Sequence, residues 1–236
     1  SASYDFSVTS LGEEPLAFNG GAANVVAQPT RSWKYFRVVV PPEALGWDLR
    51  LVNITAGMPH LVVRRDLQPD DLSSSVGGFS TKTSWLTGER WYMSSDATGR
   101  PYAPFVQGQS PVNVGDGRIL VAGMGAMLSP GSYVVGVIDS ETTAGPAMTY
   151  TLRSRGIGIG NDPDGNPWGE QIQEIPWQDG SFTFNGVPAR ETRYVRVRVP
   201  DSVEAVGFAL DALSGESLMA VRKGQVPNSD PDINAD

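Results

Sequence analysis

Four oxygen-bearing side chains lie in one short stretch of the chain, where they could bind a hard cation. They are Asp162, Asp164, Asn166 and Glu170. Oxygen ligands at alternating positions of a tight turn suit calcium. An EF-hand loop would carry glycine at its sixth position, where this chain has Pro167. Calcium is the one cofactor that the sequence suggests; the competing interpretation is a polar linker rich in turn-forming residues.

A second group of residues that could bind a ligand is aromatic. The stretch from about 70 to 117 is rich in Ser, Thr and Gly and contains Trp85, Trp91, Tyr92 and Tyr102. Exposed rings stack on sugars or pack against extended peptides, and long loops on a rigid scaffold commonly carry binding residues. The competing interpretation, which we favour, is that these rings hold the insert onto the rest of the protein.

Signatures of the common catalytic classes are missing from the sequence. There is no Gly-x-Ser-x-Gly, His-Glu-x-x-His or Walker pattern. The absence of cysteine and the single histidine, His60, exclude disulfides, thiolate metal sites and multi-histidine metal sites. Carboxylate pairs such as Glu13 and Glu14 are sequence neighbours, and nothing places them across a cleft as glycoside hydrolysis requires. We therefore expect this chain not to be an enzyme.

Composition limits the class of protein. The chain has 236 residues, 26 acidic and 18 basic side chains and a net charge of -8. The 27 glycines and 18 prolines, with only 19% charged residues, argue against helical bundles, and 40% hydrophobic residues argue against disorder. An acidic chain is repelled by nucleic acid, and no apolar run is long enough to span a bilayer. Because the chain starts at Ser1, we expect a mature or excised segment.

The elements that would position these residues are predicted to be strands. Aromatic and β-branched residues or apolar–polar alternation mark short segments separated by Gly, Pro and Ser. These segments are 33–40 (WKYFRVVV), 47–54 (WDLRLVNI), 61–63, 119–122, 133–138 (YVVGVI) and 148–153 (MTYTLR). Many short strands at this spacing predict an all-β sandwich or barrel. Residues 201–213 are an exception to this all-strand prediction, because their apolar spacing also fits a capped helix.

An internal repeat organises the chain. Residues 18–20 (FNG) recur at 184–186, residues 35–41 (YFRVVVP) recur as YVRVRVP at 194–200, and residues 57–69 align without a gap to 215–227. Three blocks in the same order indicate duplication. The alignment makes 208–213 the counterpart of the strand at 47–54, so we predict a strand there rather than a helix. The second repeat is incomplete, which would leave one sheet uncovered.

These blocks resemble the bacterial pre-peptidase C-terminal domain, a small β-sandwich appended to secreted peptidases and other exported enzymes. The matches are 35–41, 57–69, PGSYVVGV at 130–137 and YTL at 150–152, with 194–200 and 215–224 in the second repeat. Two aspartates of the family pattern are replaced, by Met58 and His60 in the first repeat and by Glu216 and Leu218 in the second. Some relatives bind calcium through acidic residues, so the resemblance does not extend a calcium site to this turn of the first repeat.

The resemblance implies tandem antiparallel, jelly-roll-like β-sandwiches. We expect a first domain at 1–160 with the insert, an acidic linker at 161–180, and at 181–236 the N-terminal part of a second sandwich. The implied function is a non-catalytic accessory or binding module of a larger secreted bacterial protein, at the cell surface or outside the cell. The partner would be the remainder of that polypeptide or a second chain that completes the C-terminal domain.

Two alternatives stay open. One is a structural building block of a surface assembly or filament, completed by strand exchange. The other is a domain that binds polysaccharide or an extracellular protein through its aromatic insert.

Overall fold

The computed structural model describes residues 12–57, 59–69, 118–122, 128–139, 145–188, 191–215, 217, 219–224 and 226–227. Within these ranges it contains ten strands and no helix, which confirms the all-β prediction. The strands are β1 (Glu13–Pro15), β2 (Gly21–Gln28), β3 (Lys34–Val40), β4 (Gly46–Ala56), β5 (Pro59–Arg65), β6 (Arg118–Ala122), β7 (Gly131–Asp139), β8 (Met148–Gly158), β9 (Glu170–Ile175) and β10 (Tyr194–Val197). No described helix is long and apolar enough to cross a membrane.

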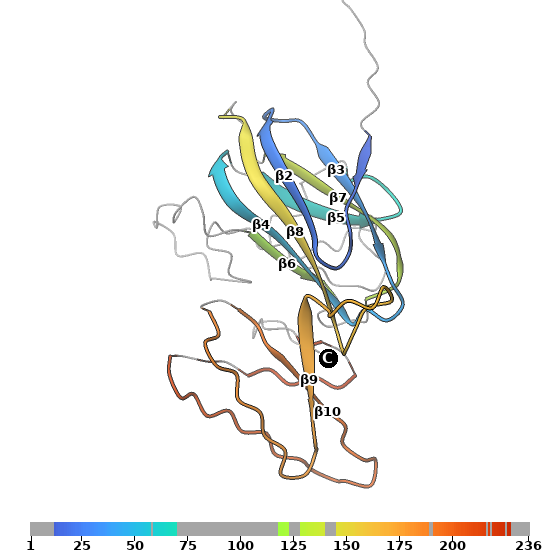
Figure 1. The fold of residues 1–236 in the computed structure, drawn as a ribbon, viewed down its shortest axis with the longest axis vertical. Helices are drawn as coiled ribbons and strands as arrows, with labels where there is room; N and C mark the ends of the chain where they lie inside the picture. The colour runs from blue at the N-terminus through green and yellow to red at the C-terminus, as the bar shows by residue number, and fades with distance from the viewer. Residues whose placement is uncertain are drawn as a thin grey trace, which may run out of the picture.

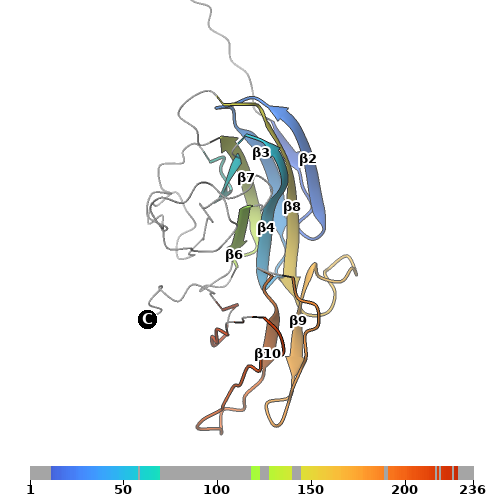
Figure 2. The ribbon, with the colours of Figure 1, turned by 90° about the vertical axis from the view of Figure 1, so that its left-hand side faces the viewer.

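The strands form two sheets. One has the order β1-β3-β7-β5, and the other has the order β10-β9-β8-β4-β6, with β2 also paired to β8. Figure 1 shows β9 and β10 beyond one end of the remaining strands, and Figure 2 shows β3 and β7 on one side of β4 and β8. Strand β8 pairs with β2, β4 and β9. It therefore lies in the middle of the larger sheet, between the pair β9–β10 and the pair β4–β6.

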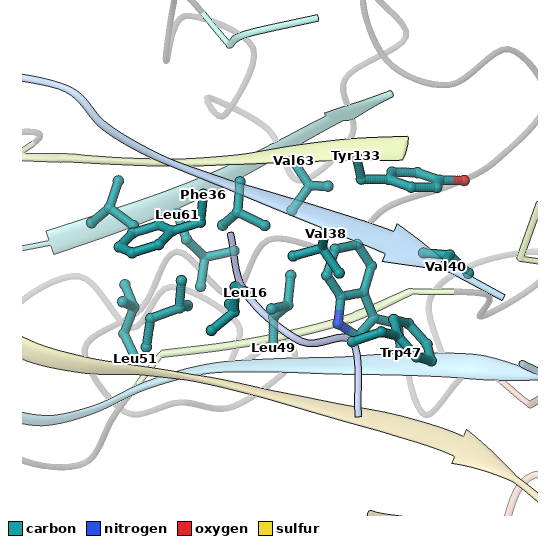
Figure 3. Close-up of a cluster of buried hydrophobic side chains, with 14 of the residues drawn as sticks. Leu16, Phe36, Val38, Val40, Trp47, Leu49, Leu51, Leu61, Val63 and Tyr133 are labelled. Carbon is teal, nitrogen blue, oxygen red and sulfur yellow. The ribbon is translucent and has the colours of Figure 1, made fainter. Parts of the chain in front are cut away.

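The larger of two buried apolar clusters is the core between the two sheets; the smaller one joins Ile157 of β8 to Ile172 of β9, Tyr194 of β10 and Val226. Side chains from β3 and β5 point toward side chains from β4, as Figure 3 shows. Successive residues of a strand point to opposite faces, so every second residue enters this core. The fully buried residues that follow this alternation include Phe36 and Val38 on β3 and Leu49 and Leu51 on β4. The period of two read from the sequence is therefore the period that builds the core.

Trp47 lies at one end of this core with its polar atom satisfied. Its indole nitrogen donates a hydrogen bond to the Ser154 hydroxyl at 2.8 Å, and that hydroxyl donates to the Phe18 carbonyl at 2.6 Å. The rings of Phe18 and Tyr133 lie 5.5 and 5.6 Å from the Trp47 ring. A buried tryptophan needs such a partner for its N–H. This chain of contacts ties β4 to β8 and to the turn before β2.

The sheets are mixed, so the prediction of antiparallel sheets is wrong at three strand pairs. β1 runs parallel to β3, β8 to β9, and β9 to β10. Hairpin-connected strands run antiparallel, whereas parallel neighbours need a longer connection. Between β1 and β3 the chain leaves the first sheet to form β2 on β8, so β3 returns in the direction of β1.

Strand β8 continues beyond its predicted end at residue 153 and includes Gly156, Ile157 and Gly158. No strand is predicted over these glycines from the sequence. A Cβ on Gly156 would lie 2.6 Å from the Trp168 ring, and one on Gly158 would lie 2.5 Å from it. The two glycines are therefore strand residues that let Trp168 pack directly onto the backbone.

Residues 201–213 form neither a helix nor a paired strand. The strand predicted at 208–213 is wrong for the described part of the chain, and the helical alternative is wrong as well. The reason lies in pairing: the counterpart β4 is held between β8 and β6, whereas no described strand pairs with 208–213. Apolar alternation alone does not make a strand without a neighbour that accepts its backbone hydrogen bonds.

Substitution of Leu51 by alanine should strongly destabilise the protein. Leu51 is fully buried, and removing such a side chain costs about 2–5 kcal/mol of the free energy of unfolding. The measurement is urea unfolding followed by circular dichroism. The control is Leu210→Ala, because Leu210 is 49% exposed and should change the free energy by roughly 0.5 kcal/mol or less. Equal losses in the two variants would contradict this account of the core.

Candidate functional site

Residues 172–204 repeat the strand pairing of residues 13–45 at a constant offset. In the first repeat β1 pairs parallel to β3 with Glu13 opposite Tyr35. In the second, β9 pairs parallel to β10 with Ile172 opposite Tyr194. Both partners are displaced by 159 residues, so the duplication seen in the sequence extends to strand register.

The turns repeat at the same offset. The amide of Ser32 donates to the Pro29 carbonyl, and that of Glu191 donates to the Pro188 carbonyl. The same holds for Ala44 with Pro41 and for Val203 with Pro200, at 3.2 and 3.0 Å. These hydrogen-bonded turns flank the segments that carry β3 and β10.

One aligned block differs from the sequence alignment. A Cβ on Gly21 would lie 2.1 Å from the Ala17 carbonyl oxygen, and one on Gly180 would lie 2.1 Å from that of Pro176. Residues 18–20 and 177–179 form the corresponding turns. The counterpart of the FNG block is therefore 177–179 and not the identical triplet at 184–186. Identity of three residues is a weaker guide here than turn geometry.

Further along, the offset becomes 158, again with matching backbone conformation. Gly57 and Gly215 have φ of 72° and 73°, a region that favours glycine. Asp66 and Gly224 have φ of 60° and 77°. The alignment of 57–69 with 215–227 is thus matched by the backbone at these two positions.

The second repeat carries a row of exposed apolar residues at the positions that form the core of the first. We call this row the apolar face; it comprises Val195, Val206, Phe208, Leu210, Met219 and Val221. Their counterparts are Phe36, Trp47, Leu49, Leu51, Leu61 and Val63, all in the buried core. Exposure is 42% for Phe208 and 61% for Val221, against 0% for their counterparts Leu49 and Val63.

A partly buried ion-pair network joins the two repeats. Arg50 on β4 donates from Nε to Asp48 Oδ1 at 2.9 Å and from Nη2 to Glu191 Oε2 at 2.9 Å. Arg155 on β8 pairs with Asp48 and donates to Glu191 at 3.3 Å. The positive charges of Arg50 and Arg155 therefore balance the negative charges of Asp48 and Glu191 at the contact between the repeats.

The network perturbs the acidity of Glu191. Burial alone would raise the pKa of this carboxyl, but hydrogen bonds and charge from Arg50, and then from Arg155, outweigh burial and hold the pKa below its usual value. The same carboxylates raise the pKa of Arg50 despite its burial. Both groups are therefore ionised at neutral pH, as a structural network requires.

The pKa of Glu170, at the start of β9, is shifted in the opposite direction to that of Glu191. Its carboxylate accepts from Arg193 Nη1 at 2.8 Å and lies 3.7 Å from Arg155. Burial raises the pKa of Glu170, and the attraction of Arg193 and Arg155 offsets only part of this effect. The pKa values of the two carboxylates that share Arg155 are therefore shifted in opposite directions.

The turn at residues 162–167 is built around Asp162. One carboxylate oxygen of Asp162 accepts from the amides of Asp164 and Asn166 at 3.1 and 2.8 Å, and the other accepts from the Asn19 side chain at 2.8 Å. The Asn19 hydrogen bond, with the backbone donors, lowers the pKa of Asp162. Asn19 also donates to the Pro167 carbonyl and accepts from Gly169 at 2.7 Å, so it fastens this turn to the first repeat.

The structure does not bring the four predicted calcium ligands together as one set. Asp162 is engaged by Asn19 and backbone amides, whereas Glu170 is engaged by Arg193. Within the described ranges no group of three or more His, Cys, Asp or Glu side chains could hold a metal ion. Calcium binding at this turn stays a prediction. The candidate ligand-binding residues Trp85, Trp91, Tyr92 and Tyr102 lie outside the described residues.

Sequence reasoning missed the residues that join the repeats. Asn19 lies in the FNG triplet at 18–20, yet the sequence does not indicate its long-range contacts with Asp162, Pro167 and Gly169. Asp48 and Arg50 are the polar positions of the alternating segment at 47–54, and only the partner Glu191 shows that they form a junction. The interpreted linker at 161–180 also contains β9.

Comparison with known proteins adds no relative. No family model, no curated protein and no solved structure matches this chain. The likeness to the pre-peptidase C-terminal domain therefore remains an interpretation of the sequence blocks.

Two glutamine substitutions should change stability with opposite pH dependence. Ionised Glu191 stabilises the fold above its unfolded pKa of about 4.3, and this contribution disappears as pH falls through its lower folded pKa. Glu191→Gln should therefore be less stable than the parent at pH 7, with the difference narrowing below about pH 4.3. The free energy of unfolding of Glu191→Gln and of the parent is measured by chemical denaturation between about pH 3 and pH 7, and the same series serves for Glu170→Gln.

Because the folded pKa of Glu170 is raised, the parent gains stability as pH falls through that pKa toward about 4.3. The stability of Glu170→Gln relative to the parent should thus decrease over this range. Matching slopes for the two variants would contradict the opposite assignments.

Calcium binding can be tested directly at the Asp162 turn. If the turn binds calcium, titration calorimetry should give a heat of binding that is lost in Asp162→Asn, and EDTA should lower the melting temperature of the parent. Asp179→Asn, outside the predicted set, is the control. An unchanged melting temperature with no heat of binding would overturn the calcium prediction.

Proposed function

We propose that this chain is a non-catalytic accessory module of a larger exported bacterial protein, built from tandem sandwiches similar to the pre-peptidase C-terminal domain. The observation that carries the proposal is the repeat of strand register and turns at an offset of 159 residues. Duplicated β modules that pack through a fixed junction hold their binding surfaces at a set spacing, and linked modules gain avidity from that spacing.

The junction supports this role. Arg50 and Arg155 lie on strands of the first repeat, and Glu191 lies three residues before β10 of the second. A junction of paired charges, in addition to the β8–β9 pairing, favours a defined orientation over a free hinge. Such a module would help an attached enzyme, for example a peptidase or another exported hydrolase, to fold, be secreted or stay near its substrate.

The native mass of the gene product tests this proposal. An antibody against residues 12–227 should detect, in culture supernatant or cell-surface fractions, a species much heavier than the 25.2 kDa of this chain. Mass spectrometry of that band should return peptides from an additional domain. A native species of 25.2 kDa would overturn the accessory role.

A structural role is the second candidate, and the apolar face favours it. A chain that leaves such a face uncovered can assemble when a neighbour supplies a strand. Size-exclusion chromatography with light scattering separates the two functions, because assembly requires an oligomer and an accessory module does not.

A further inference from the structure

We infer that the apolar face of the second repeat is the inner face of a second sandwich, and that it is covered by two β-strands with the pattern of β7 and β8, contributed by further residues of the same polypeptide. The inference rests on the proposed function, in which the chain belongs to a larger protein. It goes further by assigning the covering element, its register and its side-chain chemistry.

The first covering strand follows from the free edge of β10. In the first repeat β3 has β1 on one edge and β7 on the other. In the second repeat β10 has β9 in the place of β1, and among the described residues nothing lies in the place of β7. A strand there would meet backbone groups of β10 that no described strand pairs, as strand addition requires.

The same strand would also reach the far part of the apolar face. Val135 on β7 pairs with Phe36 on one side and with Val63 on the other. The counterparts of Phe36 and Val63 are Val195 and Val221. One strand with an apolar residue at the place of Val135 therefore lies between both exposed valines and covers them together.

The second covering strand is the counterpart of β8. In the first repeat Leu49 pairs with Ser154, and Leu51 pairs with Leu152. Phe208 and Leu210 occupy the places of these two leucines, in a segment that no described strand pairs. A strand alternating like β8 would supply backbone partners for 205–212 and convert this segment into the strand that its sequence predicts.

The chemistry of the covering strands follows from the residues that cover the first core. The inward residues of β7 are Tyr133, Val135 and Val137, and those of β8 are Met148, Tyr150 and Leu152. All are at most 1% exposed. The occupant is thus an apolar-alternating strand pair with aromatic and branched residues facing inward, and not a charged peptide or a sugar.

A second copy of this chain is a poor source of these strands. Its β7 is already held between β3 and β5, and its β8 between β4 and the β2–β9 edge. Releasing them would uncover the core of the donor while covering that of the acceptor. Chain order favours the same polypeptide, because β7 and β8 follow β5 in the first repeat and their counterparts would follow residue 227.

The test supplies the missing strands in cis. The probe is the full chain extended at its C-terminus, through a flexible Gly/Ser linker, by a second copy of its own residues 128–158. We expect amide exchange at 194–197 and 205–223 to slow by about tenfold or more, and the fluorescence of the apolar-surface dye ANS to fall. Leu210→Ala, tolerated in the unextended chain, should become destabilising in the extended one.

The matched control carries Val135→Asp and Leu152→Asp in the appended copy only, which leaves the first core unchanged. This control should give the exchange rates and dye fluorescence of the unextended chain. Unchanged exchange in the chain extended by the parental segment would overturn the inference, whatever the native mass shows. So would a dimer of the unextended chain, seen by light scattering, in which the same amides are already protected.

Discussion

The need to cover one apolar sheet face with another governs this protein. Phe36 and Val38 on β3 and Leu49 and Leu51 on β4 are fully buried only because the two sheets face each other. Strands β7 and β8 complete those sheets: β7 lies between β3 and β5, and β8 holds β4. The first repeat has both strands and is a packed core. The second repeat has the same inward positions without a described strand over them, and there the same pattern is exposed.

Strand β8 has two roles that the glycines at its end make compatible. Up to Ser154 it presents inward side chains to the core and a hydroxyl to Trp47. Gly156 and Gly158 have no side chains, so Trp168 packs directly on the backbone there. Between them, Ile157 pairs with Glu170 at the start of β9. The last strand of the first repeat, β8, therefore pairs with the first strand of the second repeat, β9. Arg155, on the same strand, adds ion pairs with Asp48 and Glu191 to this contact between the repeats.

Aromatic and β-branched residues between turn formers, with apolar–polar alternation at 47–54, were enough to predict all six strands named from the sequence in the first repeat, because each of them has a neighbour to pair with. The strand predicted at 208–213 from the alignment of the repeats is wrong, because among the described residues this segment has no strand to pair with. Strands β1, β2 and β9 carry no comparable signal: β1 has three residues, and β9 has only two apolar residues, Ile172 and Ile175, in a stretch that reads as a polar linker. The parallel pairings of β1 and β9 depend on where the chain crosses between layers, which local sequence does not encode. The junction was hidden for a related reason, since Arg50 and Glu191 are 141 residues apart.

Energetics explains why the ion pairs of the junction are not enough to stabilise the second repeat. The ion pairs at Glu191 are partly buried, and such pairs contribute little net stability once the loss of hydration is counted. Burial of each large apolar side chain contributes about 1.5–3 kcal/mol. The apolar face comprises six such residues, so covering them would outweigh the junction several-fold. The ion pairs, together with the buried apolar cluster of Ile157, Ile172, Tyr194 and Val226, therefore fix β9 and β10 on the first repeat. Burial of Phe208, Leu210 and Val221, by contrast, requires strands that cover them.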